Sequence, residues 1–339
     1  MLANSSQMVL RNIADLQGRI LVVEPEADQL GFQLNLPHVS CWSTDAAVQD
    51  KWQQAGIKCI FSAQPQVEQA FASETFDTIV LFYPKSKEQL AFTLQQLTSA
   101  MTAQSQLYLV GDNKGGIKSL ANHASKLGLH AHKLDSAKHC LWFSVSGNLQ
   151  QSPASTFSQF HITTTAGKLT ICSLPGVFNH GKLDVGTALL LQHLTHINQG
   201  TVLDFACGAG IVGAFLKQQA PDIELHCSDI SALAVAASKA TLQANQLQGT
   251  VVAAAGLPAQ PAKFHHIVSN PPFHTGLKTD YSISEAFIEQ SKQRLLPGGS
   301  LTLVANNHLA YQTILERVFT KVTVLAREHG FVVYQAFNR

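Results

Sequence analysis

The sequence of 339 residues is 45% hydrophobic and 13% charged, a composition that can fill two domain cores and argues against disorder. Lys and Arg number 23 against 22 Asp and Glu, so bulk charge gives no support to a nucleic-acid partner, although it does not exclude a locally basic face. No run reaches the ~18 consecutive apolar residues that a membrane helix needs, and the first residues lack the cationic start and apolar run of a secretory signal.

Cysteine and histidine are the residues that would carry a disulfide framework or a metal site. The 6 cysteines include no CxxC pair and show no metal-ligand spacing. The 15 histidines form no HxxxH or HExxH spacing. We therefore expect reduced thiols, no bound metal, no membrane partner and a cytoplasmic protein. We also expect the chain to act as a monomer.

In the N-terminal half, short apolar runs alternate with longer amphipathic stretches, which is typical of βαβ units and a mostly parallel sheet. A helix is predicted over Lys87–Met101. Residues 148–156 are polar and have no apolar period, so they predict a linker between a domain at 1–147 and a second domain at 157–339. Strands are predicted at Arg19–Val23, His38–Trp42, Lys58–Phe61, Thr78–Phe82, Gln106–Val110 and Cys140–Val145.

The C-terminal half repeats this alternation. Strands are predicted at Thr201–Phe205, Glu224–Ser228, Thr250–Ala254, His266–Ser269, Ser300–Ala305, Val322–Ala326 and Val332–Phe337. Helices are predicted at Gly186–His196, Gly210–Gln219, Ser231–Asn245, Ser284–Leu296 and Tyr311–Phe319. The last two strands predict an antiparallel hairpin. The predicted fold class is therefore α/β, with two tandem Rossmann-like domains that resemble class I methyltransferases in their parallel sheet and C-terminal hairpin.

The two halves also resemble each other in sequence. Residues 76–84 (FDTIVLFYP) align with residues 264–272 (FHHIVSNPP) at an offset of 188. Residues 107–113 (LYLVGDN) align with residues 301–307 (LTLVANN) in the same order. Two such matches predict duplicated domains, although two unrelated α/β domains would share some local patterns of this kind.

The first copy lacks the features that would bind a ligand in the second. It has Phe82 where the second copy has Asn270, and Glu24-Pro25-Glu26 where the second copy has a glycine loop. Pro25 has no backbone N–H, and no glycine lets a ligand approach the chain there. We expect the N-terminal domain to keep the fold without a cofactor site.

A glycine loop follows the first predicted strand of the C-terminal half. Residues 202–210 (VLDFACGAG) leave a strand and open a helix, and Gly208 and Gly210 permit a tight turn at the helix N-terminus. Asp229 follows the next strand and can accept both hydroxyls of an unphosphorylated ribose. Gly208, Gly210 and Gly213 together have the GxGxxG spacing of a nicotinamide-binding site, so a nicotinamide cofactor is the alternative interpretation of this loop. Asp204 favours a methyltransferase, because it matches the acidic residue that those enzymes use near the methionine amine.

Residues 267–273 (IVSNPPF) are the most specific feature of the chain. They end the fourth predicted strand of the half, where doubly wound sheets bind ligands. Two successive prolines stiffen the turn, so the Asn270 side-chain oxygen and the Pro271 carbonyl can each accept one N–H of an exocyclic amine. This grip aims the nitrogen lone pair at an electrophilic methyl group. Phe273 supplies a ring for stacking. The predicted catalytic residues are Asn270, Pro271, Pro272 and Phe273.

The tetrapeptide resembles the motif of methyltransferases that act on amino groups of adenine, guanine or glutamine. Together with residues 273–276 (FHTG), 176–187 (GVFNHGKLDVGT) and 111–116 (GDNKGG), it makes nearly the whole chain similar to the bacterial ribosomal RNA small subunit methyltransferase C family. The resemblance implies methyl transfer from S-adenosylmethionine to the exocyclic N2 of a guanine in 16S rRNA of the assembled small ribosomal subunit.

The resemblance also implies further site residues. Residues 178–187 would close over the methionine end of the cofactor, with Phe178 and His180 near the substrate. His274 flanks the same pocket. The implied cofactor-binding residues are Asp204, Ala206, Gly208, Gly210, Asp229 and Thr187.

The chain departs from the family pattern at three places. Ala206 stands where the usual loop has its first glycine, and His265 replaces an acidic residue. Ala253–Ala255 offers no Asp or Asn to the adenine. We expect backbone atoms to recognise the adenine.

A lysine-rich segment lies in the N-terminal half. Residues 111–140 include Lys114 and Lys118 and hold more Lys than Asp or Glu. They predict a surface that contacts RNA phosphates, with an ordinary solvated face as the alternative. The N-terminal domain would then recognise RNA or support the structure.

Three other functions are compatible with the sequence. They are a large-subunit rRNA guanine-N2 methyltransferase, a protein glutamine N5 methyltransferase and a non-catalytic RNA-binding assembly factor. The duplicated N-terminal domain and Phe273 in place of Tyr argue against the glutamine enzymes. The intact Asn270 and Asp204 argue against the non-catalytic factor.

Overall fold

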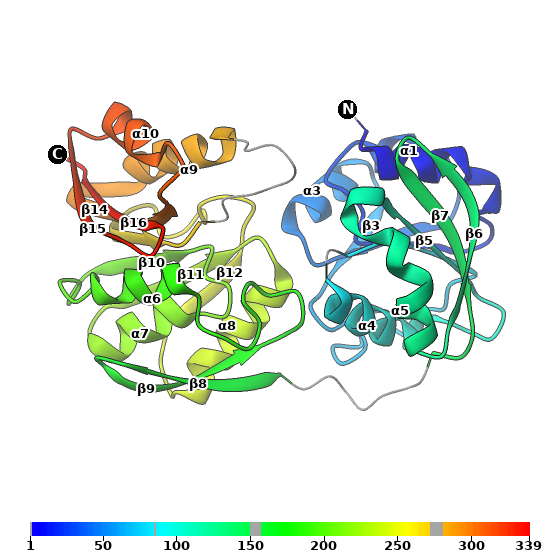
Figure 1. Cartoon of the computed structure of the whole chain (residues 1–339), viewed down its shortest axis with the longest axis horizontal. Helices are drawn as coiled ribbons and strands as arrows, with labels where there is room; N and C mark the ends of the chain where they lie inside the picture. Colours follow the sequence, from blue (N-terminus) through cyan, green and yellow to red (C-terminus); the bar gives the residue numbers. More distant parts are fainter. Residues whose placement is uncertain (1, 85, 150–156, 272–280) are drawn as a thin grey trace. The chain divides into compact units, whose positions relative to one another are not determined.

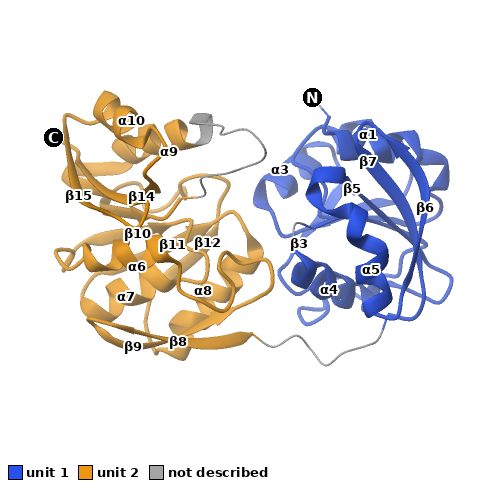
Figure 2. Ribbon diagram, viewed as in Figure 1, with its two compact units in different colours: residues 1–156 blue, residues 157–339 orange. Residues whose placement is uncertain are grey.

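The computed structural model (Figure 1) describes residues 2–84, 86–149, 157–271 and 281–339, of which 281–283 are described by their backbone alone. The internal contacts divide the chain into two compact units, residues 1–156 and 157–339 (Figure 2). The division lies at the C-terminal end of the predicted linker.

Unit 1 (residues 1–156) contains one seven-stranded sheet. Its strands are β1 (Ile20–Val23), β2 (Val39–Ser43), β3 (Lys58–Phe61), β4 (Thr78–Phe82), β5 (Gln106–Asp112), β6 (His130–Ala137) and β7 (Cys140–Ser146). Its α-helices are α1 (Asn4–Arg11), α2 (Leu30–Gln33), α3 (Ala46–Gln54), α4 (Lys87–Gln96) and α5 (Leu120–Lys126). The spatial order is β3-β2-β1-β4-β5-β7-β6, and β7 runs against the other strands.

Neighbouring residues of β1 face two different cores. Leu21 and Val23 belong to a core that includes residues of α4 and α5. Ile20 and Val22 belong to a core that includes residues of α1, α2 and α3. Successive side chains of a strand point to opposite faces of the sheet. Both faces are therefore covered by helices, as parallel strands require.

Unit 2 (residues 157–339) has a second seven-stranded sheet and a separate hairpin. The hairpin pairs β8 (Ser158–Thr164) with β9 (Gly167–Ser173). The sheet strands are β10 (Thr201–Phe205), β11 (Glu224–Asp229), β12 (Thr250–Ala253), β13 (Phe264–Ser269), β14 (Leu295–Asn306), β15 (Lys321–Glu328) and β16 (Phe331–Phe337). The α-helices are α6 (Val185–Gln192), α7 (Ile211–Gln219), α8 (Ala232–Ala244), α9 (Tyr281–Arg294) and α10 (Tyr311–Val318).

The two sheets have the same topology. The order in unit 2 is β12-β11-β10-β13-β14-β16-β15, which repeats that of unit 1. The closing hairpins keep one register at an offset of 191, pairing His130 with Ser146 and Lys321 with Phe337. A β-bulge recurs at the matching place, after Lys133 in unit 1 and after Val324 in unit 2. A bulge is one extra residue at a defined position, so its recurrence supports duplication. The predicted tandem α/β fold is confirmed.

The predicted elements differ from the structure mainly at the sheet edges. The edge strand β6 and the hairpin β8–β9 are not among them. β14 begins at Leu295 rather than at the predicted Ser300 and follows directly after α9, which ends at Arg294. The helix predicted through Met101 ends at Gln96 and continues as a 3₁₀ turn over Leu97–Ala100.

No helix in the described part of the chain is long and apolar enough to span a membrane. All six cysteines are buried and have free thiols. Among the described residues, no three His, Cys, Asp or Glu side chains gather as a metal site would require.

Candidate active site

Three features singled out in the sequence meet at one edge of the unit 2 sheet. β10 is a parallel neighbour of both β11 and β13, and Asp204 pairs with Cys227 on one side and Val268 on the other. The carboxyl ends of these strands carry the glycine loop, Asp229 and Asn270. The strand order reverses between β10 and β13, and open α/β sheets bind ligands at such a point.

The loop after β10 contains three residues with positive φ, namely Ala206 at 57°, Gly208 at 53° and Gly210 at 75°. A Cβ on Gly208 would meet no atom within 4 Å, so this glycine borders open space that a ligand can enter. A Cβ on Gly210 would lie 3.0 Å from Ser238 Cα. Gly210 therefore allows α8 to approach the start of α7. Ala206 has the positive φ that a glycine, the usual residue at this position, would adopt without strain.

Asp229 holds the glycine loop in place from the end of β11. Its Oδ2 accepts a hydrogen bond from Gly208 N at 3.0 Å, and its Oδ1 accepts one from Ser231 N at 2.9 Å. Ser231 is the N-cap of α8, so Asp229 joins the loop to that helix. The side chain is only partly buried, and a carboxylate oxygen can accept more than one hydrogen bond. This position suits a ribose.

Asp204 lies beneath the loop rather than at its surface. It is 1% exposed, and its Oδ2 accepts a hydrogen bond from Gly213 N at 2.8 Å. Burial raises the pKa of this carboxyl to about 7, against the opposing effect of the Gly213 hydrogen bond, and Asp229 adds a smaller increase. The observed contact of Asp204 ties β10 to α7. The sequence pattern identified an acidic residue here but not its burial.

The buried Asp204 predicts a pH dependence of stability. An acid whose pKa is higher in the folded chain than in the unfolded chain stabilises the fold fully below the unfolded pKa of about 4, and this stability is lost as pH rises through about 7. Asp204→Asn keeps an acceptor for Gly213 N and does not ionise. Its stability relative to wild type should therefore rise between pH 4 and pH 8, by at most about 4 kcal/mol.

Urea denaturation of both proteins across this pH range measures the difference. Asp222→Asn changes an exposed carboxyl of the same unit and should not reproduce the effect. A stability difference between Asp204→Asn and wild type that is constant with pH would contradict the burial of an ionisable Asp204.

Asn270 lies at the end of β13 and is held by α6. Its Nδ2 donates to Thr187 Oγ1 at 2.9 Å and to Asp184 Oδ2 at 3.2 Å. Ser269 Oγ donates to Phe205 O at 2.8 Å, which ties the end of β13 to the end of β10. Pro271 is buried. The three remaining predicted residues of this motif region, Pro272, Phe273 and His274, lie outside the described residues.

The segment that leads into α6 is anchored to the hairpin β8–β9. His180 Nδ1 is 2.9 Å from Ser173 Oγ, and His180 Nε2 is 3.4 Å from Ser158 Oγ. Both ring nitrogens of His180 thus face hairpin serines. Phe178 is 64% exposed. Asp184, which the sequence analysis did not single out, is the contact that joins this segment to Asn270.

The same edge of the unit 1 sheet has different chemistry. The pairings of β1 with β4 and of β10 with β13 place Glu24 where unit 2 has Ala206, and Glu24 has a similar φ of 51°. Its carboxylate accepts hydrogen bonds from Ser43 Oγ at 3.0 Å and from Thr44 N at 3.1 Å. Phe82, at the position of Asn270, is 5% exposed. A glutamate side chain therefore occupies the tip of β2 in unit 1, where Asp229 holds a glycine loop in unit 2. Lys114 and Lys118 lie exposed just after β5.

Comparisons with known proteins agree with this division of the chain. The model of the Methyltransferase small domain matches residues 168–335, and that of the Methyltransferase small domain N-terminal matches residues 6–163. Fold and site thus define a methyltransferase of the doubly wound α/β class. The protein named Ribosomal RNA small subunit methyltransferase C in Pseudomonas putida (strain W619) is 40% identical to this chain over 334 residues, which cover 98% of both chains. The protein of the same name in Pseudoalteromonas translucida (strain TAC 125) is 38% identical over 341 residues, which cover 99% of both chains. The chain belongs to the ribosomal RNA small subunit methyltransferase C family, as its motifs predicted.

A solved structure shares the fold over the whole chain. It is the T. thermophilus 16S rRNA N2 G1207 methyltransferase in complex with AdoMet and guanosine. The TM-score is 0.83 at 23% identity, and the match covers 99% of this chain and 92% of that chain.

Proposed function

We propose that this chain transfers a methyl group from S-adenosylmethionine to the exocyclic N2 of a guanine in 16S rRNA. The observation that carries the proposal is Asn270, held at the switch point of the sheet with its amide hydrogens turned to α6. Full-length relatives named as small-subunit rRNA methyltransferases, and a structural relative solved with AdoMet and guanosine, support it. We further propose that the substrate is the small ribosomal subunit and that the enzyme works as a monomer in the cytoplasm.

The glycine loop and Asp229 fit the cofactor. The open space beside Gly208 admits a ligand close to the backbone, and the partly exposed Asp229 is placed to accept the ribose hydroxyls. Asp204 and Gly210 shape this site from below, through Gly213 and α8. Ala206 lies in the same loop, and Thr187 lies in α6 beside Asn270. The bound cofactor supplies its methyl group as an activated sulfonium, so the protein needs to position the acceptor rather than to provide a strong base.

The residues after β13 orient the guanine amine. Asn270 Oδ1 and the Pro271 carbonyl each accept one amine N–H, which directs the nitrogen lone pair toward the methyl group. Pro272 stiffens this turn and Phe273 stacks on the base. Phe178, with its exposed ring, and His274 complete the substrate side. His180 acts on the substrate through the segment that it anchors to β8–β9.

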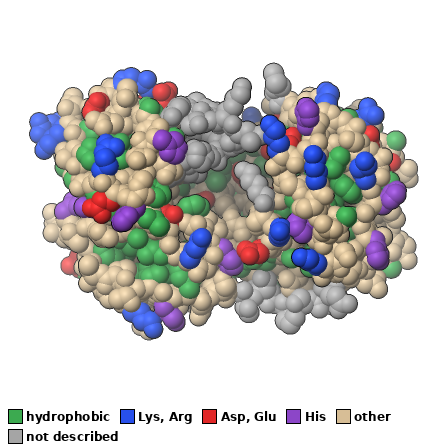
Figure 3. All heavy atoms as spheres, in the orientation of Figure 1, with side chains coloured by type: hydrophobic (Ala, Val, Ile, Leu, Met, Phe, Trp, Pro, Cys, Tyr) green, Lys and Arg blue, Asp and Glu red, His purple; other side chains and the backbone are tan. Residues whose placement is uncertain are grey.

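The lysine-rich segment of unit 1 provides the phosphate-binding surface in this proposal. Figure 3 shows Lys, Arg and His side chains spread over the visible face of unit 1. Lys114 and Lys118 follow β5, at the carboxyl edge of the sheet. Cationic side chains of this kind contact phosphates without reading sequence. The exposed lysines of the segment are Lys114, Lys118, Lys126, Lys133 and Lys138.

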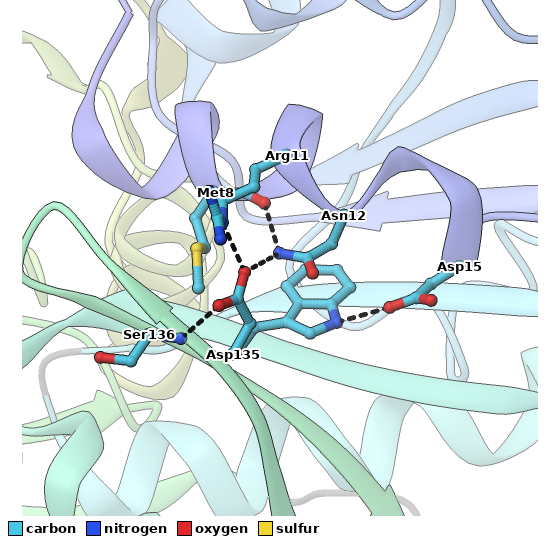
Figure 4. A network of polar contacts seen from close by, with 7 residues as sticks. Met8, Arg11, Asn12, Asp15, Asp135 and Ser136 are labelled. Atoms are coloured by element: carbon cyan, nitrogen blue, oxygen red, sulfur yellow. Dashed lines mark hydrogen bonds and ion pairs between the residues drawn. The ribbon is translucent and has the colours of Figure 1, made fainter.

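The acidic side chains of this segment are engaged within unit 1. Arg11 Nε and Asn12 Nδ2 donate to Asp135 Oδ2 at 2.7 and 3.3 Å (Figure 4). Arg11 is the main reason that the pKa of Asp135 is lowered. Asp112 Oδ1 accepts from the backbone N–H of Lys114 at 2.7 Å. These contacts bind neither carboxylate to a lysine ammonium of the segment, so Asp112 and Asp135 do not hold these lysines away from phosphates.

Methylation of purified small subunits tests the function. Subunits from a strain that lacks this protein are incubated with the enzyme and S-adenosylmethionine, and 16S rRNA nucleosides are analysed by mass spectrometry. We expect one N2-methylguanosine per subunit. Methylation of large-subunit RNA or of a glutamine instead, or cofactor binding without methylation of any RNA, would contradict the proposal.

A further inference from the structure

The start of α6 is a tightly built feature beside the proposed methyl-transfer site. Asp184 is the N-cap of α6, and its Oδ2 accepts a hydrogen bond from Thr187 N at 2.9 Å. A Cβ on Gly186 would lie 3.0 Å from this same oxygen and 2.8 Å from Phe331 Cε1. Glycine at position 186 therefore leaves the space in which Asp184 Oδ2 and the Phe331 ring lie, and Thr187 N and Asn270 Nδ2 hold this oxygen by hydrogen bonds. The cap therefore places a carboxylate oxygen at a fixed point next to Asn270.

Hydrogen-bond polarity at this point allows one orientation of the Asn270 amide. Asp184 Oδ2 and Thr187 Oγ1 both lie within hydrogen-bond distance of Asn270 Nδ2, at 3.2 and 2.9 Å. An ionised carboxylate only accepts hydrogen bonds, and an amide nitrogen has two N–H groups to donate. Thr187 Oγ1 donates its own proton to Asp184 Oδ2 at 3.4 Å. Thr187 Oγ1 therefore accepts the hydrogen bond from Asn270 Nδ2 with one of its lone pairs. The reversed amide would set its oxygen against the carboxylate.

We propose that Asp184 and Thr187 form an amide anchor that makes Asn270 present its oxygen, and never its NH₂ group, to the substrate. This inference rests on the proposed function and adds the residues that determine its acceptor chemistry. With the anchor in place, the site selects a substrate nitrogen that carries N–H groups, such as an exocyclic amine. A reversed amide would donate to the amine nitrogen and occupy the lone pair that must attack the methyl group. Asp184 and Thr187 are positioning residues, since they act through Asn270.

The anchor assigns Thr187 a role different from cofactor binding. In the structure its hydroxyl contacts Asn270 and Asp184, and its backbone N–H contacts Asp184. A residue that only binds the cofactor would change cofactor affinity and leave the methyl-transfer rate at saturation unchanged. A residue that orients Asn270 would lower that rate and leave cofactor affinity unchanged.

Thr187→Val and Thr187→Ser form a matched pair for this test. Valine keeps the shape of the side chain and the capped N–H but removes the hydroxyl, whereas serine keeps the hydroxyl. For Thr187→Val we expect kcat on methyl-free small subunits to fall about 10- to 100-fold at unchanged S-adenosylmethionine affinity. Thr187→Ser should recover most of the rate. A raised dissociation constant with unchanged kcat for Thr187→Val would overturn the anchor and make Thr187 a cofactor ligand.

A charge exchange provides a second test that does not depend on Thr187. Asn270→Asp alone sets a carboxylate against Asp184, so activity should fall at least about 10-fold through like-charge repulsion. Adding Asp184→Asn supplies an N–H group that can donate a hydrogen bond to the new carboxylate, and activity should partly return. No recovery in the double variant, with both proteins folded by circular dichroism, would overturn the anchor. Wild type that fails to methylate guanine N2 would instead overturn the proposed function, so the two failures are distinguishable.

Discussion

Asn270→Ala should lower the single-turnover rate of guanine methylation by about 30- to 1000-fold. In the proposed mechanism Asn270 Oδ1 holds the amine in line as the methyl moves, and loss of one positioned polar group in a water-poor site raises the barrier by roughly 2–4 kcal/mol. Cofactor affinity should change little, because Asp229 holds the glycine loop through contacts that do not involve Asn270. Rapid-quench methylation of methyl-free small subunits at saturating S-adenosylmethionine measures this rate.

Two further variants serve as controls for Asn270→Ala. Asn198→Ala removes an exposed asparagine that precedes β10, at the opposite edge of the same sheet, and should keep the wild-type rate. Phe82→Asn places the amide at the matching position of unit 1 and should create no activity, because Glu24 and Pro25 still replace the glycine loop there. A near-normal single-turnover rate for Asn270→Ala would mean that other groups hold the amine.

The sheet topology was predictable because its central strands have strong sequence signals. β4 is buried throughout and β13 is buried from Ile267 to Ser269, and such runs are typical of strands in a parallel sheet that is covered on both faces. The match of residues 76–84 to residues 264–272 marks the same strand in each unit, and the pairings of β1 with β4 and β10 with β13 confirm it.

The strands β6 and β8 were missed because they bury few side chains and contain no apolar run. In β6 no residue is fully buried, and in β8 only Ile162 is. Without an alternation of apolar and polar residues, a strand has little signal in the sequence. The hairpin β8–β9 is held instead by contacts with α8, such as Asn245 Oδ1 with Thr170 N at 2.9 Å. Such a contact between distant residues cannot be read from a local pattern.

The candidate site was predictable in its position but not in its internal contacts. The end of β13 and the loop after β10 were identified from Asn270 and the glycines, since the ends of parallel strands meet at one edge. The contact of Asp184 with Asn270 spans 86 residues. An aspartate before an apolar helical run signals an N-cap, so the cap of α6 was detectable in the sequence. The hydrogen bond between this carboxylate and Asn270 can be identified only in the folded structure.

The roles of the loop glycines also needed the structure. Sequence spacing treats Gly208 and Gly210 alike, as residues that let a ligand approach. In the fold, a Cβ on Gly208 would enter open space, whereas a Cβ on Gly210 would meet Ser238. Gly208 therefore borders the open space that we propose for the cofactor, and Gly210 allows two helices to pack. This difference can be measured with one substitution at each position.

Gly210→Ala should destabilise the protein by roughly 2–5 kcal/mol and greatly reduce S-adenosylmethionine binding. Alanine at a φ of 75° is strained by about 1–2 kcal/mol. Its Cβ would also lie 2.9 Å from Ser238 Oγ and 3.0 Å from Ser238 Cα, and such overpacking costs about 1–3 kcal/mol. Because Ser238 Oγ donates to Gly208 O at 3.0 Å, a shift of α8 would distort the loop as well. Urea denaturation and calorimetric titration of the cofactor measure the two effects.

Gly208→Ala is the matched substitution in the same loop. Its φ of 53° has the same sign, but its Cβ would meet no atom within 4 Å. We expect only the backbone strain of about 1–2 kcal/mol in stability. We expect a clear loss of cofactor affinity, because the added methyl group occupies space that the ligand must enter. Equal losses of stability in the two variants, or unchanged affinity in Gly208→Ala, would contradict the separate roles assigned to these glycines.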